Sequence, residues 1–150
     1  MLVTCYQPDA ATMKRILPIA LLAMMQPALA ADPRPQPIRF AAGASSATVE
    51  GAVVRGDRDL YTIGAAAGQT MTVSISAFES NAAFQLYAPG ARVGKDSDGI
   101  LAVQGQALPG AGETDDATRW TGRLPASGDY LVVVGGTRGN ASYRLTVAIK

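Results

Sequence analysis

The sequence contains no histidine and a single cysteine, Cys5, among its 150 residues. Without histidine the chain lacks the commonest general base at neutral pH, the usual partner of a catalytic serine or cysteine, and the imidazole ligands of zinc sites. One cysteine excludes an internal disulfide. Paired carboxylates remain as a route to catalysis, but the balance favours a protein that is not an enzyme. We therefore predict no catalytic residue, no metal and no cofactor.

A net charge is also lacking. Of the 13 basic and 12 acidic residues, Lys14, Arg15 and Asp9 precede Ala31, so the rest of the chain holds eleven of each sign. Proteins that bind nucleic acids or membrane surfaces need a basic excess on one face. The composition therefore indicates neither kind of partner.

The first 30 residues have the features of a cleavable signal peptide. Met13 is followed by Lys14 and Arg15, an apolar run over 16–25, and the triplet Ala28-Leu29-Ala30. A basic start, a short apolar core and an Ala-x-Ala end are the features of secretory signals. The apolar run is also shorter than the about 20 residues that a spanning helix needs. We expect export to the periplasm and no membrane anchor after processing.

We expect translation to start at Met13, because residues 1–12 carry Asp9 and no basic residue. Cys5 would then be absent from the product. Cleavage after Ala30 leaves no cysteine at the new terminus to carry a lipid. Prolines alternate with polar residues over 31–37, which predicts an extended lead-in, so the folded domain is expected at 38–150.

From Ile38 onward, apolar and polar residues alternate in short runs that Gly, Pro, Asn and Asp interrupt. The clearest run is 70–77, where Met71, Val73 and Ile75 alternate with threonines and serines. Period-2 alternation is typical of a strand with one buried face. About eight strands are expected, at 48–55, 60–65, 70–77, 84–86, 100–103, 120–124, 130–134 and 143–149.

These strands predict an all-β antiparallel β-sandwich, jelly-roll-like or Greek-key-like, because two sheets must close on each other to bury their apolar faces. The stretch 91–118 is rich in Gly, Asp and Ala. It is longer than ordinary loops, so it is either a mobile excursion or carries a strand of its own. Trp120 is expected in the core.

Several turns carry a family resemblance. The segments Gly43-Ala44-Ser45-Ser46-Ala47, Gly68-Gln69, Leu124-Pro125-Ala126-Ser127-Gly128-x-Tyr130, Thr137-Arg138 and Ile149-Lys150 resemble those of periplasmic inhibitors of g-type lysozyme. The resemblance implies a protein that binds a g-type lysozyme and blocks its substrate groove with surface loops. The turns around Gly68 and Ser127 also resemble bacterial pre-peptidase C-terminal domains, which implies an alternative function in carbohydrate binding or protein assembly.

Arg138 lies between glycines at the tip of the last hairpin, so we expect its side chain to be exposed. The resemblance places an arginine of this turn in the lysozyme cleft. A guanidinium donates paired hydrogen bonds to carboxylates, which suits an acidic sugar-binding groove. The alternative is an ordinary exposed arginine. The family has a second basic residue four positions later, but this chain has Ser142 there. The family also has an aromatic residue near the start of the turn at 55–59, where this chain has Gly56.

The other candidate partner-binding residues lie in three turns. Arg55, Asp57 and Arg58 would add charge from a neighbouring loop, and Asn140 lies beside Arg138. Ser127 and Tyr130 resemble a surface motif of other lysozyme inhibitors, although a Ser-Gly turn before a packed tyrosine equally serves a tight strand entry.

One acidic segment, Asp96-Ser97-Asp98-Gly99, has a superficial likeness to a calcium loop. It lacks the regular ligand spacing and the terminal glutamate of an EF-hand, so a solvated loop is favoured. We expect the protein to be a monomer or a weak dimer.

Overall fold

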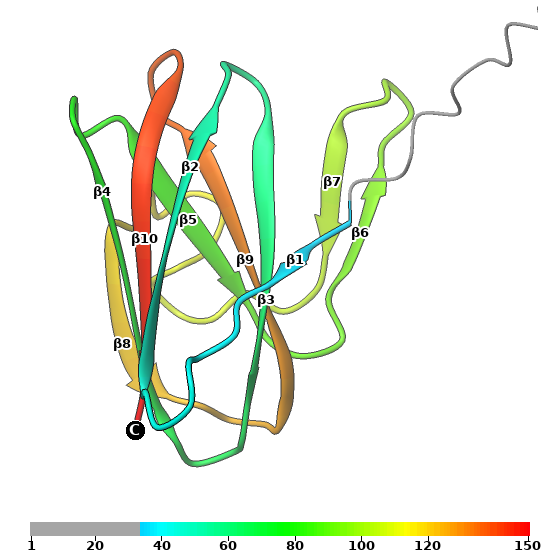
Figure 1. The fold of residues 1–150 in the computed structure, drawn as a ribbon. Helices are drawn as coiled ribbons and strands as arrows, with labels where there is room; N and C mark the ends of the chain where they lie inside the picture. Colours follow the sequence, from blue (N-terminus) through cyan, green and yellow to red (C-terminus); the bar gives the residue numbers. More distant parts are fainter. Residues whose placement is uncertain (1–33) are drawn as a thin grey trace, which may run out of the picture. The chain divides into compact units, whose positions relative to one another are not determined.

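The computed structural model describes residues 34–150, which form β-strands and loops (Figure 1). The predicted signal peptide and the predicted start at Met13 lie outside the described residues. Within the described part, no helix is long and apolar enough to cross a membrane.

Most strands belong to two four-stranded sheets. Sheet A has the order β1-β3-β9-β5, and sheet B has the order β2-β10-β4-β8. A separate hairpin pairs β6 with β7. The strands are β1 (Gln36–Pro37), β2 (Ser46–Val53), β3 (Arg58–Ala65), β4 (Thr70–Ala77), β5 (Ala82–Tyr87), β6 (Arg92–Lys95), β7 (Leu101–Gln104), β8 (Arg119–Arg123), β9 (Gly128–Gly136) and β10 (Ala141–Ile149).

Consecutive strands of the sandwich alternate between the sheets. The chain passes from β2 in sheet B to β3 in sheet A, returns to B for β4, and continues so through β5, β8, β9 and β10. This is a jelly-roll arrangement, and the predicted β-sandwich is confirmed. Pairing is antiparallel except between β1 and β3, which are parallel. Gln36 and Pro37 therefore extend sheet A just before the expected start of the domain.

The main core lies between the two sheets. Inward-facing residues of β4 and β10, such as Met71, Val73 and Leu145, are fully buried there. The alternation that predicted β4 thus reports a strand with one face on the core. Trp120 is half-buried at the margin of this core, where its indole N–H donates to the Pro109 carbonyl at 2.9 Å.

A second, smaller core covers the outer face of sheet A. Leu131 and Val133 of β9 are buried beneath Val93, Leu101 and Val103 of the β6–β7 hairpin. The neighbouring residues of β9 face the main core, so this strand is buried on both faces. An uninterrupted apolar run, 131–134, is typical of such a strand.

The long stretch between β5 and β8 is organised by the edge of sheet A. It holds the hairpin that begins with β6, one strand more than predicted, and then runs beside β5. The amide of Leu86 donates to the Ala111 carbonyl at 2.8 Å, and the amide of Leu108 donates to the Leu86 carbonyl at 2.8 Å. The interpretation in which the stretch 91–118 carries a strand of its own is therefore confirmed.

Candidate functional site

Three loops meet at one end of the sandwich, which is the upper end in Figure 1. They are the β2–β3 loop (54–57), the β4–β5 loop (78–81) and the β9–β10 loop (137–140). We call this surface the three-loop end. The opposite end carries the β3–β4 loop (66–69) and the β8–β9 loop (124–127).

Asn81 connects two of these loops and is the one buried polar side chain within residues 34–150. Its amide nitrogen donates to the carbonyl oxygens of Arg138, at 3.2 Å, and Asn140, at 2.7 Å. The backbone carbonyl of Asn81 accepts from the backbone amide of Thr137 at 2.8 Å. A buried amide with these bonds is costly to disturb, so Asn81 fixes the β9–β10 loop against the β4–β5 loop.

Asn140 connects the third loop. Its side-chain oxygen accepts a hydrogen bond from the Arg55 amide at 2.9 Å. The Asp57 amide donates to the Val54 carbonyl at 2.9 Å and closes the β2–β3 turn. Asn140 therefore acts on the shape of the three-loop end, while the side chains of Arg55 and Asp57 are exposed on it.

Arg138 lies at the tip of the β9–β10 loop and is exposed, as predicted from its place between glycines. One guanidinium nitrogen donates to the Glu79 carbonyl at 3.4 Å, a long bond. Two arginines and two acidic residues are exposed on these loops: Arg55, Arg138, Asp57 and Glu79. The end therefore carries both signs of charge in equal number.

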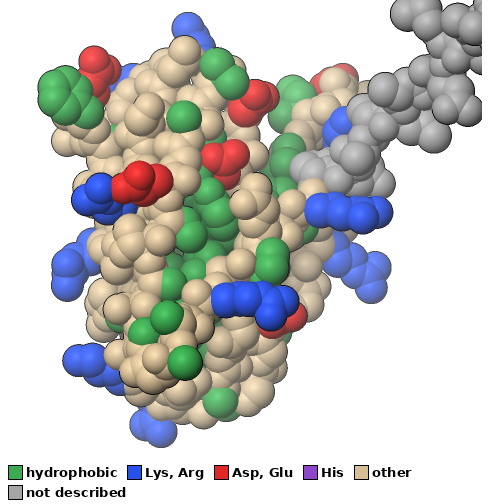
Figure 2. Space-filling view, in the orientation of Figure 1, with side chains coloured by type: hydrophobic (Ala, Val, Ile, Leu, Met, Phe, Trp, Pro, Cys, Tyr) green, Lys and Arg blue, Asp and Glu red, His purple; other side chains and the backbone are tan. Residues whose placement is uncertain are grey.

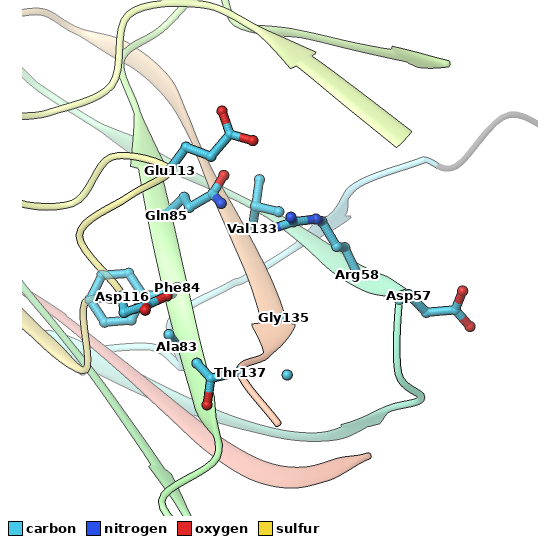
Figure 3. Close-up of a pocket in the computed structure, with 12 residues that line it drawn as sticks. Asp57, Arg58, Ala83, Phe84, Gln85, Glu113, Asp116, Val133, Gly135 and Thr137 are labelled. Carbon is cyan, nitrogen blue, oxygen red and sulfur yellow. The ribbon is translucent and has the colours of Figure 1, made fainter. Parts of the chain in front are cut away.

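Arg58 opens β3 and differs from its neighbour. Figure 3 shows its side chain extending over sheet A towards Val133, whereas Asp57 points away. The guanidinium lines a hollow of about 130 Å³ with Gln85, Glu113 and Asp116 on the outer face of sheet A. Arg58 therefore faces the side of the sandwich.

The charges over this face act on the pKa of a buried tyrosine, Tyr87. Burial raises the pKa of its hydroxyl, the negative charge of Glu113 raises it further, and the positive charge of Arg58 lowers it. Its hydroxyl donates to the Gln85 side-chain oxygen at 2.8 Å. This face is thus a mixed-charge surface.

Ser127 and Tyr130 lie at the opposite end of the sandwich from Arg138. β9 separates them, because it begins at Gly128 and ends at Gly136. The Ser127 hydroxyl oxygen accepts from the Ala67 amide at 2.8 Å and joins the β8–β9 and β3–β4 loops. The structure does not bring this turn together with the three loops.

Tyr130 is fully buried. Its hydroxyl donates to the Ala126 carbonyl at 2.6 Å and accepts from the Ala126 amide at 3.2 Å. The expectation of Tyr130 as a contact residue is corrected here, because its ring fills the core and its hydroxyl closes its own turn. Tyr130 is thus the packed tyrosine of a tight strand entry, which was the other interpretation of this motif.

Another buried tyrosine, Tyr143, supports the three-loop end from below. The Tyr143 hydroxyl donates to Asp59 at 2.5 Å and lies 2.7 Å from the Tyr61 hydroxyl. Burial, followed by the hydrogen bond to Asp59, raises the pKa of Tyr143 far above its ordinary value. Gly51 faces this tyrosine, and a side chain there would overlap its hydroxyl.

One feature of the site was missed in the sequence. Phe78, in the β4–β5 loop, is 100% exposed, and Val54 of the β2–β3 loop is 54% exposed. Figure 2 shows a hydrophobic side chain standing out beside an acidic one at this end. A sequence signal was present, because Phe78 continues the polar positions Thr72, Ser74 and Ser76 of β4.

The acidic segment after β6 forms an ordinary turn. A side-chain oxygen of Asp96 accepts from the amides of Asp98 and Ile100, both at 2.9 Å. Within residues 34–150, no three Asp, Glu, His or Cys side chains are grouped to hold a metal ion.

Solved structures provide the comparison with known proteins. The PliG periplasmic lysozyme inhibitor of g-type lysozyme from Aeromonas hydrophila is 37% identical, with a TM-score of 0.60, over 77% of this chain and 95% of its own. A mutant PliG from Escherichia coli and PliG from Salmonella Typhimurium are each 28% identical over 76% of this chain and 96% of their own, with TM-scores of 0.51 and 0.50.

A pre-peptidase C-terminal domain of a Bacillus anthracis collagenase is more distant, with 16% identity and a TM-score of 0.42. No protein-family model and no curated protein matches the sequence.

Proposed function

The chain belongs to the family of periplasmic inhibitors of g-type lysozyme, and on this basis we propose that it binds a g-type lysozyme and blocks the enzyme's substrate groove. The observation that carries the proposal is the 37% identity to the Aeromonas inhibitor over 95% of that protein. We further propose that the mature protein is periplasmic, like its relatives, and acts by binding and not by catalysis.

We propose the three-loop end as the contact surface. It presents Arg138 on a loop held from behind by Asn81, so the guanidinium starts from a fixed backbone. Loops that keep their shape lose less conformational entropy on binding. Its exposed arginines, Arg55 and Arg138, also suit an acidic groove, since opposite charges favour encounter.

The test is an assay of cell-wall clearing by a goose-type lysozyme. The full chain is expressed in bacteria, and the product is purified and titrated against the enzyme. We expect clearing to slow as the inhibitor is added and to stop at molar excess. Normal clearing at large excess would refute the proposal.

Specificity is measured in the same assay with c-type and i-type lysozymes, which we expect to be inhibited less than the goose-type enzyme. Sedimentation of the protein with insoluble cell wall in the absence of lysozyme would instead favour the alternative carbohydrate-binding function.

A further inference from the structure

Phe78 is an unusual residue to find fully exposed in a folded domain. The other large hydrophobic side chains exposed within residues 34–150 are Val54, at 54%, and Ile100, at 60%. Exposed aromatic rings cost hydration free energy that burial in a partner recovers. Aromatic residues are also enriched among the few that dominate the affinity of protein interfaces.

The backbone that carries Phe78 is held in place. The Ser80 amide donates to the Ala77 carbonyl at 3.0 Å and closes a tight turn. Ser80 adopts a φ of 52°, a conformation that is uncommon for residues other than glycine. Asn81 follows, and its buried amide ties the turn to the β9–β10 loop. The ring therefore projects from a defined loop.

The surroundings of Phe78 leave it accessible from two sides. One shallow hollow runs from Phe78 over the outer face of sheet B, past Ser76 and Arg144. The other lies between the β4–β5 and β9–β10 loops, beside Asn140 and Ser142. A ring between two shallow hollows can enter a recess of a partner without first moving a neighbour.

We infer that Phe78 is the apolar anchor of the three-loop end and inserts into an apolar recess in or beside the substrate groove of the g-type lysozyme. The inference rests on the proposed function and adds a contact to it. The Arg138 guanidinium donates to the carbonyl of Glu79, the residue that follows Phe78. The cation and the ring therefore lie on two adjacent loops. An apolar recess flanked by carboxylates is the partner chemistry that this pair fits.

The test compares Phe78→Ala with the unaltered protein in the clearing assay. We expect inhibition to weaken by about tenfold or more, equivalent to about 1.4 kcal/mol of binding free energy. Because the side chain is fully exposed, the melting temperature should not change. Phe78→Tyr keeps the ring and should retain inhibition within about threefold.

Arg123→Ala is the control, because it removes a large exposed side chain at the end of β8, next to the β8–β9 loop of the opposite end of the sandwich. It should leave inhibition unchanged. If the unaltered protein inhibits and Phe78→Ala inhibits equally well, the anchor is refuted while the proposed function stands. If the unaltered protein does not inhibit, the proposed function fails and the anchor fails with it.

Discussion

The two ends of the sandwich use their side chains in opposite ways. At the end formed by the β3–β4 and β8–β9 loops, polar groups bond inward: Ser127 accepts from Ala67, and the Tyr130 hydroxyl is paired with Ala126. At the three-loop end, the side chains of Phe78 and Arg138 are exposed. The first end is fastened by its side chains. The three-loop end is fastened by the side chains of Asn81 and Asn140 and presents those of Phe78 and Arg138 outward.

This difference shows which loops are free to evolve contacts. A loop whose side chains satisfy its own backbone loses stability when they change. A loop that is secured from below can vary its exposed residues at little cost. The three-loop end therefore combines a fixed backbone with replaceable side chains.

The largest expected effect comes from a change at the end formed by the β3–β4 and β8–β9 loops. Tyr130→Ala removes a fully buried ring, and we expect a loss of about 3–5 kcal/mol in the free energy of unfolding, measured by urea denaturation. Tyr130→Phe keeps the ring and should cost about 1 kcal/mol for the lost hydroxyl bonds. Folded Tyr130→Phe should inhibit as well as the unaltered protein. A weaker inhibitor of unchanged stability would contradict the assignment of Tyr130 to the core.

The next effect tests the support beneath the three-loop end. Gly51→Ala places a methyl group against the Tyr143 hydroxyl, which Asp59 and Tyr61 hold in place. We expect a loss of about 1–3 kcal/mol from overpacking, measured by thermal unfolding. Gly94→Ala is the control, because no atom lies close to its added methyl group. Equal stability of the two variants would show that the Tyr143 side chain moves to accommodate the added methyl group.

A smaller effect separates the exposed arginines of the two ends. Arg138→Ala should weaken inhibition by about tenfold, because a cation of the proposed contact surface is lost. Arg123→Ala removes an exposed arginine at the end of β8, beside Gly68 of the β3–β4 loop, and should leave inhibition unchanged. Both variants should unfold at the same temperature as the unaltered protein. Equal inhibition by both would remove Arg138 from the proposed contact.

The smallest effect concerns pH. Well below pH 10 Tyr143 keeps its proton in both the folded and the unfolded chain. As the pH approaches and passes 10, only the unfolded chain releases it, because the folded pKa is raised. Stability should therefore fall as the pH rises, by about 0.8 kcal/mol from this residue at pH 10.5. Tyr143→Phe should flatten the decline measured by urea denaturation, and an unchanged slope would contradict the shift.

Much of the fold could be predicted because strand alternation is a local pattern. The run 70–77 became β4, and Met71 and Val73 became core residues. One strand of the hairpin over sheet A was predicted at 100–103, but its partner β6 and its position on sheet A were not. The hairpin residues Val93 and Leu101 are partly buried because the outer face of β9 is apolar too, and that contact joins segments far apart in the chain.

The candidate site was predicted in part. The position of Arg138 between glycines correctly predicted an exposed loop tip. The predicted strand 130–134 separates this tip from the turn of Ser127, which places the two at opposite ends of β9. Asn81 and Phe78 were missed because a buried asparagine and an exposed phenylalanine depart from the usual burial of their residue types. The alternation of β4 places Phe78 on the outward face, whereas only the neighbouring β9–β10 loop explains the burial of Asn81.

The sequence by itself determined the class of the fold, most strand positions and the family, because each is recorded in short segments: period-2 alternation, turn residues and shared turns. The tertiary structure decided which loops meet. Consecutive strands of the two sandwich sheets lie in different sheets, so the neighbours of a loop come from distant segments. The three-loop end exists because β2, β4 and β9 finish on the same side of the jelly roll.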